Sequence, residues 1–135
     1  MNYAIELHDS ECLAFELDSN GDVLLTLDAY VHRSDGVPCK TPGEGGNQRV
    51  CFLFESAIVS RRFGGLPAII RNGALILGES SLDLIPLPFE MHGSCNLMLE
   101  FLDDAQSIYI SGKSVRVVPD GEFRFVESVD FTRLP

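Results

Sequence analysis

The sequence predicts an all-β fold, an antiparallel β-sandwich or flattened barrel of about nine or ten strands with at most one short helix. Apolar and polar residues alternate with a period of two over most of the chain, the spacing that places one face of a strand in a core. Turn residues interrupt this alternation about every eight to twelve residues. No segment shows a long helical repeat of apolar positions.

Length and charge limit the number of domains and the kinds of partner. The chain has 135 residues, which corresponds to a single globular β domain spanning 1–135. Twenty acidic residues against ten basic ones give a net charge of -10. This acidic excess opposes binding to phosphate backbones and anionic lipids, so we expect neither a nucleic acid nor a membrane as the partner.

The predicted location is cytoplasmic. The first residues lack the basic start and apolar core of a signal peptide, and no apolar stretch is long enough to span a bilayer. The four cysteines show no Cys-x-x-Cys spacing and nothing indicates an oxidising compartment, so we expect reduced thiols and no zinc ribbon. No residue pattern indicates a bound cofactor.

The first elements form the clearest predicted hairpin. Residues 3–7 begin a short strand, and residues 12–17 continue with odd positions more apolar than even ones. Asn20-Gly21 predicts a two-residue hairpin turn, because both residues tolerate a positive φ. The return strand follows, with apolar odd positions over 23–31.

Residues 34–47 predict a long loop, because four glycines and two prolines interrupt any alternation there. Ordered loops of such length in a compact domain often carry function. A strand resumes at Arg49 with alternate apolar residues through Phe54, and residues 56–63 either extend that strand or form a short helix.

The second half of the chain predicts several short strands. Asn72-Gly73 indicates a tight hairpin within residues 67–77. Pro86 and Pro88 exclude a central strand for 82–89 and indicate an edge strand or a crossover between sheets. Further strands are predicted at 97–101, 107–110 and 115–118, with turns at Asp103-Asp104 and Gly112-Lys113 and a last hairpin arm at 122–129 after Asp120-Gly121.

Charge is unevenly distributed along the chain. Residues 1–28 hold seven acids and residues 72–104 hold six, with no base in either segment, whereas residues 29–71 hold six bases and three acids. One interpretation is that acidic and basic strands lie side by side and neutralise each other across a sheet. The other is an exposed acidic face that binds a basic partner.

His8, Asp9 and Ser10 are the three residue types of a hydrolase triad, but they are adjacent in sequence. Neighbours on a strand point to opposite faces, so we expect no convergence of His8 and Asp9 on the serine. We expect Asp9 and Ser10 to hydrogen-bond nearby backbone N–H groups in a turn instead. No other spacing indicates a catalytic group, so the sequence does not predict an enzyme.

A second polar cluster lies on the return strand. Asp28, Tyr30 and His32 share one face, opposite the apolar residues, and the loop 34–47 follows. The alternatives are a solvated strand face, a binding surface and part of a metal site, for which Asp28 and His32 are the residues in register. Together, the candidate ligand- or partner-binding residues are His8, Asp9, Asp28, Tyr30, His32, Arg33, Cys39 and Lys40.

Leu7-His8-Asp9-Ser10, with the strand and acidic hairpin that follow, resembles the opening of small bacterial domains of the immunity-protein type. Residues 108–112 and 121–127 are similar to the C-terminal pattern of the same domains. The resemblance implies a β-rich protein that neutralises a cognate toxin, and it implies no catalytic residue.

We therefore expect a non-enzymatic protein-interaction domain, an acidic inhibitor of a basic protein partner, with Tyr30 and loop 34–47 as anchors. The alternative is a small-molecule or metal-binding β module that uses Asp28, Tyr30, His32 and the same loop. Edge strands that need protection also allow a symmetric homodimer. The candidate acidic surface comprises Glu6, Asp9, Glu11, Asp18, Asp22 and Asp28.

Overall fold

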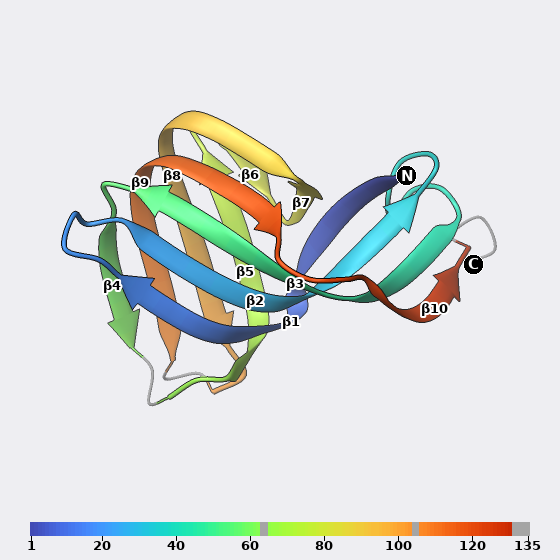
Figure 1. The fold of residues 1–135 in the computed structure, drawn as a ribbon, viewed down its shortest axis with the longest axis horizontal. Helices are drawn as coiled ribbons and strands as arrows, with labels where there is room; N and C mark the ends of the chain where they lie inside the picture. Colours follow the sequence, from blue (N-terminus) through green and yellow to red (C-terminus); the bar gives the residue numbers. More distant parts are fainter. Residues whose placement is uncertain (63–64, 104–105, 131–135) are drawn as a thin grey trace.

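The computed structural model describes residues 1–62, 65–103 and 106–130, and every regular element within them is a β-strand (Figure 1). This confirms the all-β class and the predicted number of strands. The strands are β1 (Asn2–Leu17), β2 (Val23–Ser34), β3 (Gly43–Glu55), β4 (Ile58–Arg62), β5 (Ala68–Leu77), β6 (Ser80–Leu82), β7 (Leu84–Leu87), β8 (Phe89–Phe101), β9 (Ser107–Pro119) and β10 (Arg124–Val129).

Six of the described strands close into an antiparallel barrel. Their order is β3-β2-β1-β5-β8-β9, and β9 pairs with β3 to complete the circle. The other described strands lie outside this circle: β4 pairs with β9, β6 with β5, β7 with β1 and β10 with β3. Closure pairs each barrel strand on both sides, which is the most complete way to protect sheet edges.

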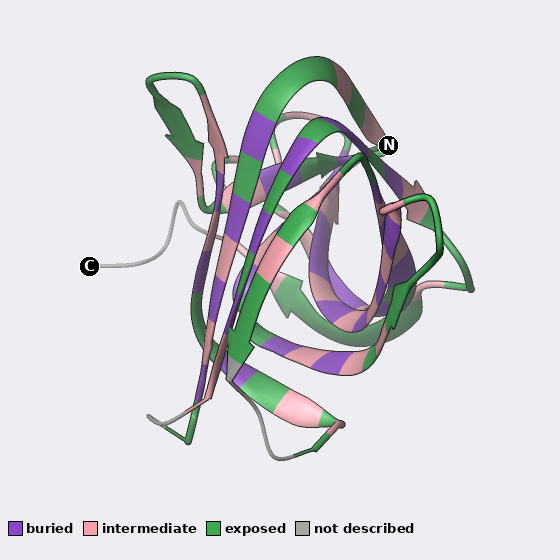
Figure 2. Cartoon of the chain, turned by 90° about the vertical axis from the view of Figure 1, so that its left-hand side faces the viewer, coloured by how far each residue is buried: buried purple, intermediate pink, exposed green. Residues whose placement is uncertain are grey.

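The barrel core comes from the period-two pattern of the sequence. On β2 the odd residues over 23–31 are at most 1% exposed, as predicted. Val50, Phe52 and Phe54 of β3 fill the barrel in the same way, and Figure 2 shows the alternation of buried and more exposed residues along the long strands. Each fully buried side chain of this size stabilises the fold by about 1.5–3 kcal/mol, because it is removed from water.

β1 is irregular at residues 7–10. Its register on β2 shifts between Glu6 and Glu11, so that these four residues lie opposite one residue, Ala29. Asp9 takes a left-handed conformation there, with a φ of 72°, which aspartate tolerates better than most residues. The strand on the other side of β1 also changes at this point. The segment of β1 before the irregularity pairs with β7, and the segment after it pairs with β5.

The buried hydroxyl of Ser10 bridges the two ends of this irregularity. It donates a hydrogen bond to the Glu6 carbonyl at 2.7 Å and accepts one from the Tyr30 amide at 2.9 Å. Ser10 thus bonds backbone groups, but not the nearby N–H groups of a turn as predicted, because its N–H donor belongs to the neighbouring strand. The expectation that His8 and Asp9 point to opposite faces is wrong: the backbone departs from regular strand geometry here, and the two side chains contact each other.

Beyond the irregularity the sheet continues past the barrel. Residues 2–6 of β1, 30–34 of β2 and 43–47 of β3, together with β10, form the part that extends to one side in Figure 1, and we call these residues the arm. β7 pairs with β1 at the base of the arm. The prediction of an edge strand for the proline-marked segment 82–89 is confirmed, since β7 lies off the main path of the sheet.

Two predicted turns lie inside continuous strands instead. β5 runs through Asn72-Gly73, and β9 runs through Gly112-Lys113. The two glycines serve close packing: a Cβ at Gly73 would lie 2.9 Å from the Leu99 side chain, and one at Gly112 would lie 3.3 Å from that of Phe54. A glycine needed for close approach of side chains therefore resembles a turn signal in the sequence.

The connection of the first hairpin is longer than the predicted two-residue turn Asn20-Gly21. Residues 18–22 join β1 to β2. The Asp18 carboxylate accepts hydrogen bonds from the amides of Asn20 at 2.8 Å and Asp22 at 3.0 Å. An aspartate that binds the backbone ahead of it defines this turn, with Gly21 at a φ of 83°.

The predicted loop at 34–47 is also shorter than expected, because residues 43–47 belong to β3 and pair with β2 and β10. The connecting loop spans 35–42. The strand glycines make room for aromatic rings: a Cβ at Gly45 would collide with Tyr30, and one at Gly46 would collide with Phe123. Rings that cover glycines in this way stabilise a strand that the sequence alone describes as irregular.

Three further details differ from the prediction or complete it. Residues 58–62 form β4, so the described part of 56–63 contains a strand and no helix, and Phe63 and Asp104 lie outside the described residues. Cys12 belongs to the even positions of 12–17, which the sequence describes as the less apolar face of the strand, but it is fully buried. The register of β1 on β2 shifts again between Cys12 and Ala14, so the alternation does not continue unbroken there. The last predicted strand, at 122–129, corresponds to β10, which pairs with β3 and not with β9.

Replacing Ser10 with alanine removes both hydrogen bonds that bridge the irregularity in β1. We expect the free energy of unfolding to fall by about 1–3 kcal/mol, because buried backbone groups lose their partner. Urea unfolding followed by circular dichroism measures this change. Ser80→Ala, at an exposed position of β6, is the control and should alter stability by less than about 0.5 kcal/mol. Equal stability of the two variants would contradict the role of Ser10.

Candidate functional site

Glu6 and two histidines meet at the base of the arm, beside the irregularity in β1. Glu6 Oε1 lies 2.7 Å from His8 Nδ1, and Glu6 Oε2 lies 2.7 Å from His32 Nε2. Glu6 and His8 are two residues apart in β1, and His32 lies on β2 directly opposite Ala4. Diagonal neighbours on adjacent strands share one face of the sheet, so a single carboxylate can contact both imidazoles.

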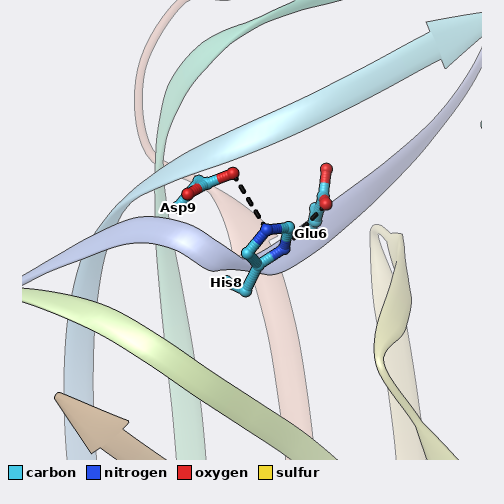
Figure 3. A group of neighbouring side chains, drawn as sticks. All are labelled: Glu6, His8 and Asp9. Atoms are coloured by element: carbon cyan, nitrogen blue, oxygen red, sulfur yellow. Dashed lines mark ion pairs between the residues drawn. The ribbon is translucent and has the colours of Figure 1, made fainter. Parts of the chain in front are cut away.

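Asp9 completes the group from the solvent side (Figure 3). Its Oδ2 lies 3.1 Å from His8 Nε2, so His8 stands between two carboxylates. The exposed fraction of the side chain rises outward, from 10% for His32 and 26% for Glu6 to 55% for His8 and 68% for Asp9. His32 is thus the inner member and His8 and Asp9 are accessible. We call these four residues the histidine–carboxylate cluster.

A cavity of about 480 Å³ opens beside the cluster. Burial, assisted by the negative charge of Glu6, raises the pKa of the Cys39 thiol in this cavity to about 11. Cys39 is therefore protonated near neutral pH, which makes it a weak nucleophile. The residues that line the cavity are Glu6, His8, His32, Cys39, Arg71, Asn72, Gly73, Asp83 and Leu84.

Tyr30 adjoins the cluster and connects it to β10. Its ring packs edge-on against the imidazole of His32, with the two centroids 5.1 Å apart. Its hydroxyl donates a hydrogen bond to the carboxylate of Glu127. Burial and this carboxylate raise the pKa of Tyr30, because both disfavour a phenolate.

Arg33 lies outside the cluster. Its guanidinium forms an ion pair with Glu44 at 2.8 Å and covers the ring of Phe123, with the guanidinium carbon 3.9 Å from the ring centroid. A cation over an aromatic face contributes about 0.5–1 kcal/mol at an exposed site. These contacts hold the arm together and indicate a structural role for Arg33.

Asp28 and His32 do not meet, although the sequence places them on one strand face. Four residues of extended chain separate them by about 13 Å, and Asp28 forms an ion pair with Arg124 of β10. Lys40 is exposed on the 35–42 loop. The structure thus groups His8, Asp9, His32 and Cys39 around Glu6, a residue that the sequence analysis assigned to the acidic surface and not to the candidate site.

A second hollow, of about 490 Å³, crosses β1, β2, β3, β9 and β8 near the 18–22 turn. Leu24 and Leu53, direct cross-strand partners, are part of its apolar lining. Among the described residues that line it, five carry carboxylates and one is an arginine, Arg116. We call this hollow the acidic groove. Its carboxylates belong to Glu16, Asp18, Asp22, Glu55 and Glu90.

Sequence reasoning identified two of the acids of this groove, Asp18 and Asp22, but not the groove. Glu16, Leu24, Leu53, Arg116 and Glu90 form one row across five strands, each paired in register with the next. Residues so distant in the chain meet through strand register, which the sequence does not display.

Comparison with known proteins adds no relative. No protein-family model, curated protein or solved structure matches this chain. The resemblance to immunity-type domains therefore stays a prediction. Within the described residues, no helix is long and apolar enough to cross a membrane.

The raised pKa of Tyr30 predicts a distinct alkaline titration. Its folded-state pKa lies above the ordinary value of 10.0, so the stability that the neutral phenol contributes is present below that value and is lost as the pH rises through the folded-state pKa. Absorbance at 295 nm should show one tyrosine of the native protein ionising late, and Tyr30→Phe should abolish that step. Glu127→Gln should move it to lower pH. An unchanged titration curve for Tyr30→Phe would contradict the assignment.

Proposed function

We propose that this protein is a non-enzymatic interaction domain that binds a basic segment of a protein partner in the acidic groove. The observation that supports the proposal is the combination, in one hollow, of an apolar lining with five carboxylates and one arginine among its described residues. A surface of this composition attracts cations and also offers apolar contact area.

The carboxylates of the groove differ in how far they are already engaged. Asp18 binds backbone amides of its own turn, and Asp22 accepts a hydrogen bond from the Ser56 amide at 3.0 Å. Glu90 lies 3.3 Å from His92 and pairs in register with Arg116. In the part of the chain that the structure describes, the carboxylates available to a partner are therefore chiefly those of two exposed residues, Glu16 and Glu55.

Lysine and arginine suit such a groove better than other residues do. Each has an apolar stem that covers hydrophobic surface and a charged head that stays near solvent. The stem can contact Leu24 and Leu53 while the head reaches Glu16 or Glu55 at the rim. Arg116 repels cations, so the basic residues of a bound segment are expected at the Glu16 end of the row.

The partner class follows from the resemblance in the first residues of the chain. Immunity-type domains neutralise a cognate toxin, and an acidic protein of this size can block a basic toxin by covering its active cleft. Complementary charge speeds such an association, and a few apolar anchors supply affinity. The proposal is thus an acidic inhibitor whose groove holds a basic segment of its target.

Binding of a basic peptide tests the proposal without knowledge of the natural partner. The probe is a fluorescein-labelled peptide of alternating lysine and leucine, followed by fluorescence anisotropy at low salt. We expect Glu16→Gln/Glu55→Gln to raise Kd about threefold to tenfold, since each exposed ion pair contributes about 0.2–1 kcal/mol. Salt near 0.3 M should remove most of the difference.

The matched control is Glu79→Gln/Glu122→Gln, two exposed acids that are not among the groove residues. It changes the net charge by the same amount, so it separates a specific groove from general acidity. The control should bind the peptide nearly as the unaltered protein does. Equal Kd values for the groove variant and the control variant would sink the proposal.

A further inference from the structure

We propose that the histidine–carboxylate cluster binds one divalent transition-metal ion such as Zn²⁺ or Mn²⁺, with Glu6, His8 and Asp9 as ligands. The site is independent of the acidic groove: among the described residues, the two share no lining residue. Figure 3 shows the three side chains directed toward one another at the irregularity in β1.

The donor set favours a transition metal. An imidazole nitrogen and two carboxylate oxygens are the ligands that Zn²⁺, Mn²⁺ and Fe²⁺ share, whereas Ca²⁺ and Mg²⁺ prefer oxygen alone. Two carboxylates beside one imidazole also leave negative charge that a divalent cation would neutralise.

The distances are close to those that a bound ion needs. One ligand atom from each of Glu6, His8 and Asp9 can be chosen so that all lie within 4.8 Å of one another. Ligand atoms around a tetrahedral Zn²⁺ ion lie about 3.3 Å apart for bonds of about 2.0 Å. The present contacts on His8 involve different ring nitrogens, Nδ1 with Glu6 at 2.7 Å and Nε2 with Asp9 at 3.1 Å, so an ion bound to one nitrogen requires the carboxylate at the other nitrogen to turn toward it.

His32 is a positioning residue for this site. It binds the Glu6 oxygen that does not face His8, with Nε2 2.7 Å from Oε2, and its side chain is 10% exposed. Carboxylates that ligate metals are usually held by a further hydrogen bond of this kind, and loss of such a partner commonly weakens metal binding 10- to 100-fold. Tyr30 packs on the ring of His32 and limits its movement.

The irregularity explains why the ligands meet. In a regular strand His8 and Asp9 would point to opposite faces. The left-handed φ of Asp9 turns its carboxylate toward His8 instead. The exposed fractions of His8 and Asp9, 55% and 68%, leave the site open to ions and water from solvent.

The test is isothermal titration of chelator-treated, tag-free protein with ZnCl₂, MnCl₂ and MgCl₂ in turn. We expect one Zn²⁺ or Mn²⁺ ion per chain with a Kd in the micromolar range, and no comparable affinity for Mg²⁺. His8→Ala and Asp9→Asn should weaken binding at least tenfold. Circular dichroism should confirm that both variants are folded, because the two side chains are exposed.

The matched control is His92→Ala. His92 and Glu90 are also two residues apart on a strand and lie 3.3 Å from each other, but they are not part of the three-ligand group found among the described residues. This variant should bind the ion as the unaltered protein does. For the positioning role, His32→Ala should weaken binding 10- to 100-fold, whereas His32→Gln, which keeps an N–H donor for Glu6, should restore most of it.

Three results would overturn the metal site. The first is a titration with Zn²⁺ and Mn²⁺ that shows no heat of binding, which would mean that hydrogen bonds alone hold the cluster. The second is binding that survives His8→Ala, which places the ion on other groups such as the cysteines. The third is an equal loss in His8→Ala and His92→Ala, which indicates weak surface binding.

Discussion

The arm and the cluster adjoin the barrel at the irregularity in β1, which one buried hydroxyl, that of Ser10, bridges. Four residues of β1 lie opposite one residue of β2, so regular pairing is lost there and backbone groups need another partner. Ser10 supplies it by bonding the Glu6 carbonyl and the Tyr30 amide at once. The same irregularity lets β1 leave β7, join β5 and close the barrel. It also brings His8 and Asp9 into contact.

Charge is used in two different ways in this molecule. Several acidic and basic residues neutralise each other across strands, as in the pairs Arg33–Glu44 and Asp28–Arg124, and this supports the first interpretation of the charge pattern. Other carboxylates gather in the acidic groove, which supports the second. The two interpretations therefore apply to different faces. In and beside the arm, charged side chains form ion pairs with one another. In the acidic groove, Glu16 and Glu55 stay exposed.

The sequence predicted the all-β fold and the inward faces of β2 and β3 well, because burial on one side of a barrel strand imposes a period of two on the residues themselves. It misjudged Gly73 and Gly112 because the Leu99 and Phe54 side chains that crowd them come from distant strands. A turn and a tight contact require the same residue, and one sequence cannot separate them.

The site was predictable in part. Glu6 and His8 are two residues apart, a spacing that places both on one strand face and could have been recognised. The contact of Glu6 with His32 depends on the register of β1 on β2, and that register includes a four-residue irregularity with no sequence signal beyond Asp9-Ser10. The acidic groove draws on five strands, so its assembly requires the whole topology.

The most direct test of this account is the hydrogen-exchange rate of the Tyr30 amide, measured by NMR. We expect strong protection, because this amide donates to a fully buried serine hydroxyl. In Ser10→Ala we expect faster exchange at Tyr30 while the amides of β8 and β9 keep their protection. Exchange of the Tyr30 amide as fast as that of an exposed loop in the unaltered protein would contradict it, because the bridge across the irregularity would then not exist.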